Sequence, residues 1–156
     1  MSFLKSILMV SALCLPVTAF AQEVVLTVNQ GEESVALTME DLKSMPFDEF
    51  ATTTQWTQGG MQVFKGVSLK DFVARFDVTE GTMRATAIND YTVEIPVSDA
   101  VENGPIIAYA LNGEAMSVRE NGPLWVIYPF DQNEEYQSEI YYSRSIWQLD
   151  RVTFAE

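Results

Sequence analysis

The chain has 156 residues, no histidine and a single cysteine, Cys14. Nine lysine and arginine residues stand against 22 aspartate and glutamate residues, which gives a net charge of −13 at pH 7. This balance excludes a general affinity for nucleic acid or for anionic lipid surfaces, because both repel an acidic chain.

The first 21 residues have the pattern of a secretory signal peptide. Lys5 supplies the positive start, residues 7–17 form an apolar run, and Ala19-Phe20-Ala21 matches a small-x-small cleavage site. The run is shorter than the roughly 20 apolar residues that a bilayer span needs. We therefore expect a periplasmic protein, cleaved after Ala21, whose residues 22–156 form one domain. An anchored N-terminal helix is the alternative.

Cleavage would leave neither a thiol nor an imidazole in the mature chain, because Cys14 would be lost. Eight cations against 22 acids would then give a net charge of −14. Disulfides, thiolate nucleophiles, imidazole bases and cysteine or histidine metal sites are excluded. A carboxylate site for calcium or magnesium stays open, although no Asp-x-Asp-x-Asp-Gly loop occurs. We expect no catalytic residue and no metal centre, hence a protein that is not an enzyme.

The N-terminal part predicts two strands and a helix. Residues 24–28 form a β-branched run that predicts a strand, and residues 35–38 predict a second one. Thr38 and Asp41 have the spacing of a capping box, so a short helix should begin after Thr38 and end before Pro46.

The middle of the chain predicts extended backbone followed by a second helix. Residues 49–56 contain three consecutive threonines, Gly59-Gly60 turns the chain, and residues 61–64 predict a strand. Ser68 and Asp71 repeat the capping-box spacing. The helix that follows should have one apolar face, made by Leu69, Phe72, Val73 and Phe76.

The remaining segments predict strands and turns. Strands are expected at 84–88, 91–95, 105–111 and 124–128, with turns at Asn89-Asp90 and Asn112-Gly113 and an acidic loop at 131–137. Residues 147–154 predict either a final strand or a pair of turns. The sequence therefore predicts an α+β fold, a mixed β-sheet with two short helices on its surface.

An ordered set of short motifs resembles the molybdopterin-binding domain of the sulfite oxidase family. These motifs are Phe64-Lys65-Gly66-Val67-Ser68-Leu69, Asn89-Asp90-Tyr91, Ile95-Pro96, Ile107-Ala108-Tyr109, Asn112-Gly113-Glu114, Gly122-Pro123-Leu124, Tyr128-Pro129 and Trp147-Gln148-Leu149 before Val152. The similarity extends from about residue 35 to residue 154. Each motif is short, and it is their common order and spacing that carry the resemblance.

Two features depart from the family pattern. The family keeps a molybdenum-ligating cysteine in the loop before its "Gly-Val-x-Leu" helix, and the corresponding stretch here is Thr52-Thr53-Thr54-Gln55-Trp56. A threonine hydroxyl offers a hard, neutral oxygen where a soft thiolate is used. The family's cofactor also carries a phosphate, which arginine and lysine usually hold. Near the late tryptophan the one available cation is Arg144.

The resemblance therefore implies a relationship to small exported members that lack the cysteine. It implies a protein that binds a free reduced pterin, or molybdopterin without molybdenum, with no covalent cofactor. It also implies regulation of a membrane enzyme of cyclic di-GMP through contact with that enzyme's periplasmic domain. Two alternatives remain: a molybdopterin-dependent oxidoreductase without the cysteine, and a structural or interaction protein whose inherited cavity is empty.

A pterin site needs a face for stacking and polar groups for the amino-pyrimidine edge. Trp56 lies in the loop where the family keeps its metal ligand, so the resemblance implies that it faces the cofactor cavity. Arg144 can stack and donate in one plane, and Tyr141 and Ser143 add an aromatic and a polar group beside it. The alternative for Trp56 is a core position and for Arg144 an ordinary surface position.

Further candidates lie in the turn Asn89-Asp90-Tyr91 and at Tyr128 and Asp131. Asp131 follows Tyr128 and Pro129, where a strand opens into a long loop, a common position for ligand-binding groups. These residues could equally serve turns or the solvated surface. Trp125 and Trp147 are expected in the core.

Overall fold

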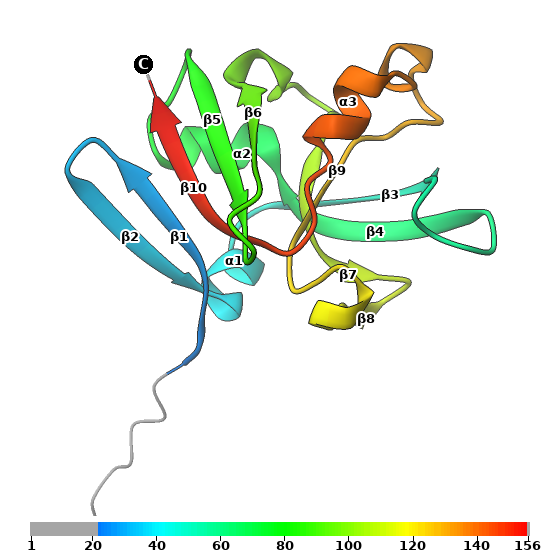
Figure 1. The fold of residues 1–156 in the computed structure, drawn as a ribbon, viewed down its shortest axis with the longest axis horizontal. Coiled ribbons are helices and arrows are strands. Elements are labelled where there is room, and N and C mark those ends of the chain that lie inside the picture. The colour runs from blue at the N-terminus through cyan, green and yellow to red at the C-terminus, as the bar shows by residue number, and fades with distance from the viewer. Residues whose placement is uncertain (1–21, 156) are drawn as a thin grey trace, which may run out of the picture.

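The computed structural model describes residues 22–155. The predicted signal peptide and its cleavage site lie outside the described residues. Over residues 22–155, no helix has the length and apolar character needed to cross a membrane. The strands form two five-stranded sheets (Figure 1).

The first sheet contains both ends of the described chain. Its strand order is β2-β1-β10-β5-β6, with bounds β1 Val24–Gln30, β2 Glu33–Thr38, β5 Thr82–Ala87, β6 Thr92–Pro96 and β10 Leu149–Ala155. β1 and β10 run parallel, and the other neighbours are antiparallel. The sheet is therefore mixed, as the sequence predicts.

The second sheet has the order β3-β4-β7-β8, and β9 pairs with the first half of β7, beside β8. Its strands are β3 Phe47–Thr53, β4 Met61–Ser68, β7 Ile106–Leu111, β8 Glu114–Ala115 and β9 Trp125–Ile127. Asn112 and Gly113 both have positive φ in the β7–β8 turn, so the hairpin predicted there is confirmed. Gly66 is required in β4, because a Cβ at this position would lie 2.0 Å from the carbonyl oxygen of Ile107 in β7.

The two sheets share one large apolar core. Its buried side chains include Leu26 and Val152 from the first sheet and Val67 and Val126 from the second. The α+β class with mixed pairing is confirmed, but the strands divide between two sheets where the sequence analysis expected one. Burial on both sides of this contact supplies most of the apolar area that stabilises the fold.

The two helices that the sequence predicts are present. Helix α1, Met39–Ser44, begins with the capping box between Thr38 and Asp41. Helix α2, Leu69–Arg75, buries Leu69, Phe72 and Val73 as expected. The capping box predicted at Ser68 is wrong, because β4 runs directly into α2 and the amide of Leu69 donates to the carbonyl oxygen of Pro105 instead.

Helix α3, Glu139–Arg144, was not predicted from the sequence. It has no fully buried residue and no side-chain cap at Ser138, so neither apolar periodicity nor a capping residue indicates it. Three single 3₁₀ turns complete the structure: η1 Val97–Asp99, η2 Val118–Glu120 and η3 Glu134–Tyr136. Helix α3 follows η3 and precedes β10 in the chain, and it packs beside β6 of the first sheet.

Candidate functional site

A cavity of about 380 Å³ opens beside α3. Four segments form its walls: the β3–β4 loop, the β5–β6 turn, α3, and the segment between α3 and β10. The lining residues are Gln55, Trp56, Ala87, Asn89, Tyr91, Glu139, Tyr142, Ser143, Ser145, Ile146, Trp147 and Gln148. A volume of this size suits a small, flat organic molecule.

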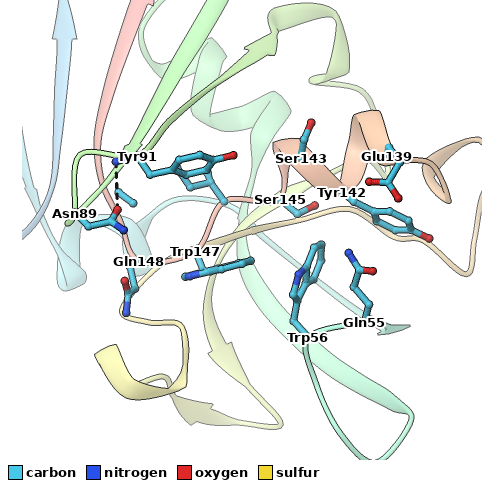
Figure 2. Close-up of a pocket in the computed structure, with 12 residues that line it drawn as sticks. Gln55, Trp56, Asn89, Tyr91, Glu139, Tyr142, Ser143, Ser145, Trp147 and Gln148 are labelled. Carbon is cyan, nitrogen blue, oxygen red and sulfur yellow. Dashed lines mark hydrogen bonds between the residues drawn. The ribbon is translucent and has the colours of Figure 1, made fainter.

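The lining separates into two polar ends with an aromatic middle. Figure 2 shows Gln55, Tyr142 and Glu139 at one end, Asn89, Tyr91 and Gln148 at the other, and Trp147 between them. Each end thus offers groups that donate or accept hydrogen bonds, while the middle offers an aromatic surface. This arrangement is typical of a site for a planar heterocycle, which needs stacking on its faces and hydrogen bonds at its edges.

Trp56 is the centre of the aromatic wall. Its ring lies 5.8 Å from that of Trp147, 6.0 Å from those of Trp125 and Tyr142, and 6.3 Å from that of Phe130. The planes of Trp56 and Trp147 meet at 61°. A flat ligand can therefore stack face to face on one of these two indoles and meet the other with its edge.

Trp125 and Trp147 have different environments. Trp125 is fully buried and donates its indole N–H to the carbonyl oxygen of Ser145, so the core position predicted for it is confirmed. Trp147 is 39% exposed and lines the cavity, so the core position predicted for it is wrong. An isolated antiparallel bridge joins the backbones of these two residues.

Hydroxyl groups set the position of Trp56. The Thr54 Oγ1 accepts hydrogen bonds from the amides of Trp56, at 3.2 Å, and Thr57, at 3.0 Å. Both Thr52 and Thr54 are buried. Within this loop, threonine hydroxyls therefore fix the backbone.

Asp131 ties this loop to the segment after β9. Its carboxylate accepts hydrogen bonds from the Thr53 amide and from the Thr52 hydroxyl, the latter at 3.0 Å. Its own amide donates to the Thr52 hydroxyl. The bond from the Thr53 amide is the main reason why the pKa of Asp131 is lowered from its usual value, and the bond from Thr52 lowers it further. Asp131 does not line the cavity; it positions the loop that does.

Arg144 is the last residue of α3, and its side chain does not line the cavity. Its guanidinium binds the Asp99 carboxylate at 2.9 Å, and the Tyr128 hydroxyl donates to the same carboxylate oxygen at 2.7 Å. Burial, followed by the negative charge of Asp99, raises the pKa of Tyr128 well above its usual range, so this hydroxyl remains protonated. The Tyr141 ring packs against Tyr128 and against the guanidinium. Arg144, Tyr128 and Tyr141 therefore do not line the cavity, and in this structure they attach α3 to the protein. Ligand contacts by these three residues stay a prediction.

Four of the predicted site residues do meet in the cavity: Trp56, Asn89, Tyr91 and Ser143. Asp90 does not, because its backbone has a positive φ and its carboxylate pairs with Arg151 at the surface. Sequence reasoning missed Gln55, Glu139, Tyr142, Trp147 and Gln148. The position of Gln55 beside Trp56 and the late tryptophan motif were available signals for three of them, whereas Glu139 and Tyr142 depend on the unpredicted helix α3.

The polar side chains of the cavity differ in their existing bonds. Gln148 donates to the carbonyl oxygen of Val118, and Ser143 and Ser145 donate within α3. Over the described residues, the side chains of Gln55 and Glu139 make no hydrogen bond to the protein. These two side chains are therefore free to bind a ligand.

The lining does not fit a molybdenum complex. Among residues 22–155 there is no group of three histidine, cysteine, aspartate or glutamate side chains that could hold a metal ion. The lining contains neither a thiolate nor a lysine or arginine for the phosphate of molybdopterin. It does fit the uncharged pterin ring, because its middle is aromatic and its ends are polar.

Comparisons with known proteins agree with this fold. The model of the oxidoreductase molybdopterin binding domain matches residues 15–131. The chain belongs to this family, and the resemblance stated above is confirmed.

Among solved structures, one similar chain is that of the sulfane dehydrogenase SoxCD from Paracoccus pantotrophus. The TM-score is 0.65 with 19% identity, over 85% of this chain and 38% of the other, so this likeness shows the fold alone. The chain thus spans well under half the length of that protein. No curated protein matches the chain by this comparison.

We expect the Trp56 loop to loosen at acid pH. Because the pKa of Asp131 is lower in the folded chain than in the unfolded one, its stabilisation is complete above the usual carboxyl pKa and is lost as the pH falls toward the lowered value. The indole N–H resonance of Trp56 should therefore shift with pH below about 4. In Asp131→Ala it should already be shifted at neutral pH.

Glu134→Gln is the matched control, because Glu134 also lies in the acidic segment but makes no bond to the loop. An unchanged Trp56 resonance in Asp131→Ala would show that Asp131 does not position this loop.

Proposed function

We propose that this chain binds a reduced pterin, without molybdenum, in the cavity beside α3. We further propose that it is a periplasmic sensor that regulates a membrane cyclic di-GMP enzyme and has no catalytic activity of its own. One observation carries the proposal: this member of a molybdopterin-binding family has an aromatic cavity whose lining contains no thiolate, lysine or arginine.

The aromatic groups support binding of a flat ring. Trp147 offers an accessible face, and Trp56 stands at 61° to it. Each stacking contact with an aromatic base contributes about 1–3 kcal/mol. A reduced pterin has a bicyclic ring of matching shape and an edge rich in N–H donors, which carboxylate and amide oxygens accept.

The polar ends of the cavity support binding of the ring's edge. The Gln55 amide can donate and accept, and the Glu139 carboxylate can only accept. Asn89 accepts from the Tyr91 amide through its Oδ1, which leaves its amide protons for a ligand. The combination resembles the donor and acceptor pattern that proteins use for guanine-like edges.

Helix α3 connects the ligand cavity with a surface that a partner protein can reach. One side of α3 lines the cavity through Glu139 and Tyr142, and Tyr141 on the same helix donates to Glu135 in η3. Glu134 and Glu135 form an exposed acidic segment there. We propose that this acidic segment meets a basic surface on the periplasmic domain of the membrane enzyme, so that ligand contacts on α3 bias the partner contact.

Removal of an indole from the cavity should weaken pterin binding. Trp147→Ala and Trp56→Ala should each lower the affinity for a reduced pterin roughly ten- to a hundred-fold, because a lost stacking contact is converted at about 1.4 kcal/mol per decade. Titration calorimetry measures this effect, with circular dichroism to confirm folding.

Phe47→Ala is the matched control, since Phe47 is an exposed aromatic residue of β3 outside the cavity. Equal pterin affinities for the wild type and both tryptophan variants would show that the ligand binds outside this cavity or does not bind at all.

The purified protein should contain no molybdenum. The reason is the absence of a thiolate in the Thr52–Trp56 loop and in the cavity lining. Elemental analysis of protein prepared from the periplasm, together with mass spectrometry of any extracted small molecule, measures this. Stoichiometric molybdenum would instead favour the oxidoreductase alternative.

Association with the partner should weaken at high salt. Opposite charges on two surfaces accelerate association, and salt screens this effect. Glu134→Gln combined with Glu135→Gln should slow association several-fold at low salt and have little effect at high salt. An on-rate that is independent of salt would leave the acidic segment without a role in recognition.

A further inference from the structure

We infer that Glu139 is a specificity-determining residue, which makes the cavity select uncharged pterins over phosphorylated ones. This inference rests on the proposed function and names the class of pterin that the site accepts. The inference rests on Glu139, the one charged side chain in the lining, and on the pairing of Arg144 and Arg151 with other carboxylates.

Glu139 is the single charged residue among the twelve that line the cavity. Its carboxylate makes no hydrogen bond or ion pair within the described residues, so its negative charge is not compensated by the protein. Figure 2 shows it on α3 at the same end of the cavity as Gln55 and Tyr142.

The nearest arginines do not offset this charge. Arg144, on the same helix, is neutralised by Asp99 at 2.9 Å. Arg151, near the β5–β6 turn, is shared between Asp90 and Asp150. The acidic segment at Glu134 and Glu135 adds further negative charge beyond α3. The field in the cavity is therefore negative.

This field treats the two classes of pterin differently. The ring of an uncharged pterin presents N–H donors, which an acceptor-only carboxylate stabilises. A phosphate monoester on the pterin side chain adds close to two negative charges at pH 7. A phosphate on a ligand in this cavity would be repelled by the Glu139 carboxylate, most strongly when the two lie closer than about 10 Å, the Debye length at 0.1 M salt.

The matched ligands for the test are dihydroneopterin and dihydroneopterin monophosphate, which share one ring and differ by the phosphate. Calorimetry at low salt should show that the wild-type protein prefers the uncharged ligand about four-fold. High salt should narrow this preference. Glu139→Gln keeps an oxygen acceptor but loses the charge, so it should narrow the preference several-fold and leave affinity for the uncharged ligand within about three-fold. Glu139→Lys should reverse the preference.

Glu33→Gln is the control for net charge, because Glu33 lies on β2, at the opposite edge of the first sheet from the β5–β6 turn. It should leave the preference unchanged. Equal binding of both ligands by the wild type, or equal effects of Glu139→Gln and Glu33→Gln, would overturn the inference while pterin binding stands. Binding of neither ligand to the wild type would overturn the proposed function, and this inference with it.

Discussion

The Asp99 carboxylate holds the candidate site together. It lies at the end of η1 and accepts from two side chains of the C-terminal part, the Tyr128 hydroxyl and the Arg144 guanidinium. Both partners are largely buried, so the pair is shielded from water and constrains the position of α3 more firmly than a surface ion pair would. Helix α3 has no buried residue of its own to anchor it. One wall of the cavity therefore depends on this polar contact together with the packing of Tyr141 and Tyr142 against the core.

Local patterns predicted much of the fold. The β-branched runs gave the strands, Asn112-Gly113 gave the hairpin, and Thr38 with Asp41 gave the start of α1, because each of these signals acts between neighbours in the sequence. The division into two sheets was not predictable in this way, since the parallel pairing of β1 with β10 joins opposite ends of the chain.

The site residues were likewise predictable only where a local sequence signal marks them. Trp56 and the Asn89 turn were accessible to sequence reasoning because a family motif or a turn pattern marks them. Arg144 was assigned to the ligand because a cation is rare in this chain, yet its partner Asp99 is 45 positions away. Trp147 was assigned to the core because tryptophan is usually buried. It is 39% exposed, because it lies in the wall of a cavity whose four segments come together only in the folded chain.

The three indoles of Trp56, Trp125 and Trp147 lie within 6.3 Å of one another. Excitation energy passes readily between chromophores at such a separation, so their emission belongs to the group and not to one ring. A pterin absorbs at the wavelengths where tryptophan emits. A pterin in contact with Trp147 would therefore quench the emission of all three indoles. The same packing that shapes the cavity thus gives the protein an intrinsic optical reporter of its own occupancy, with no label attached.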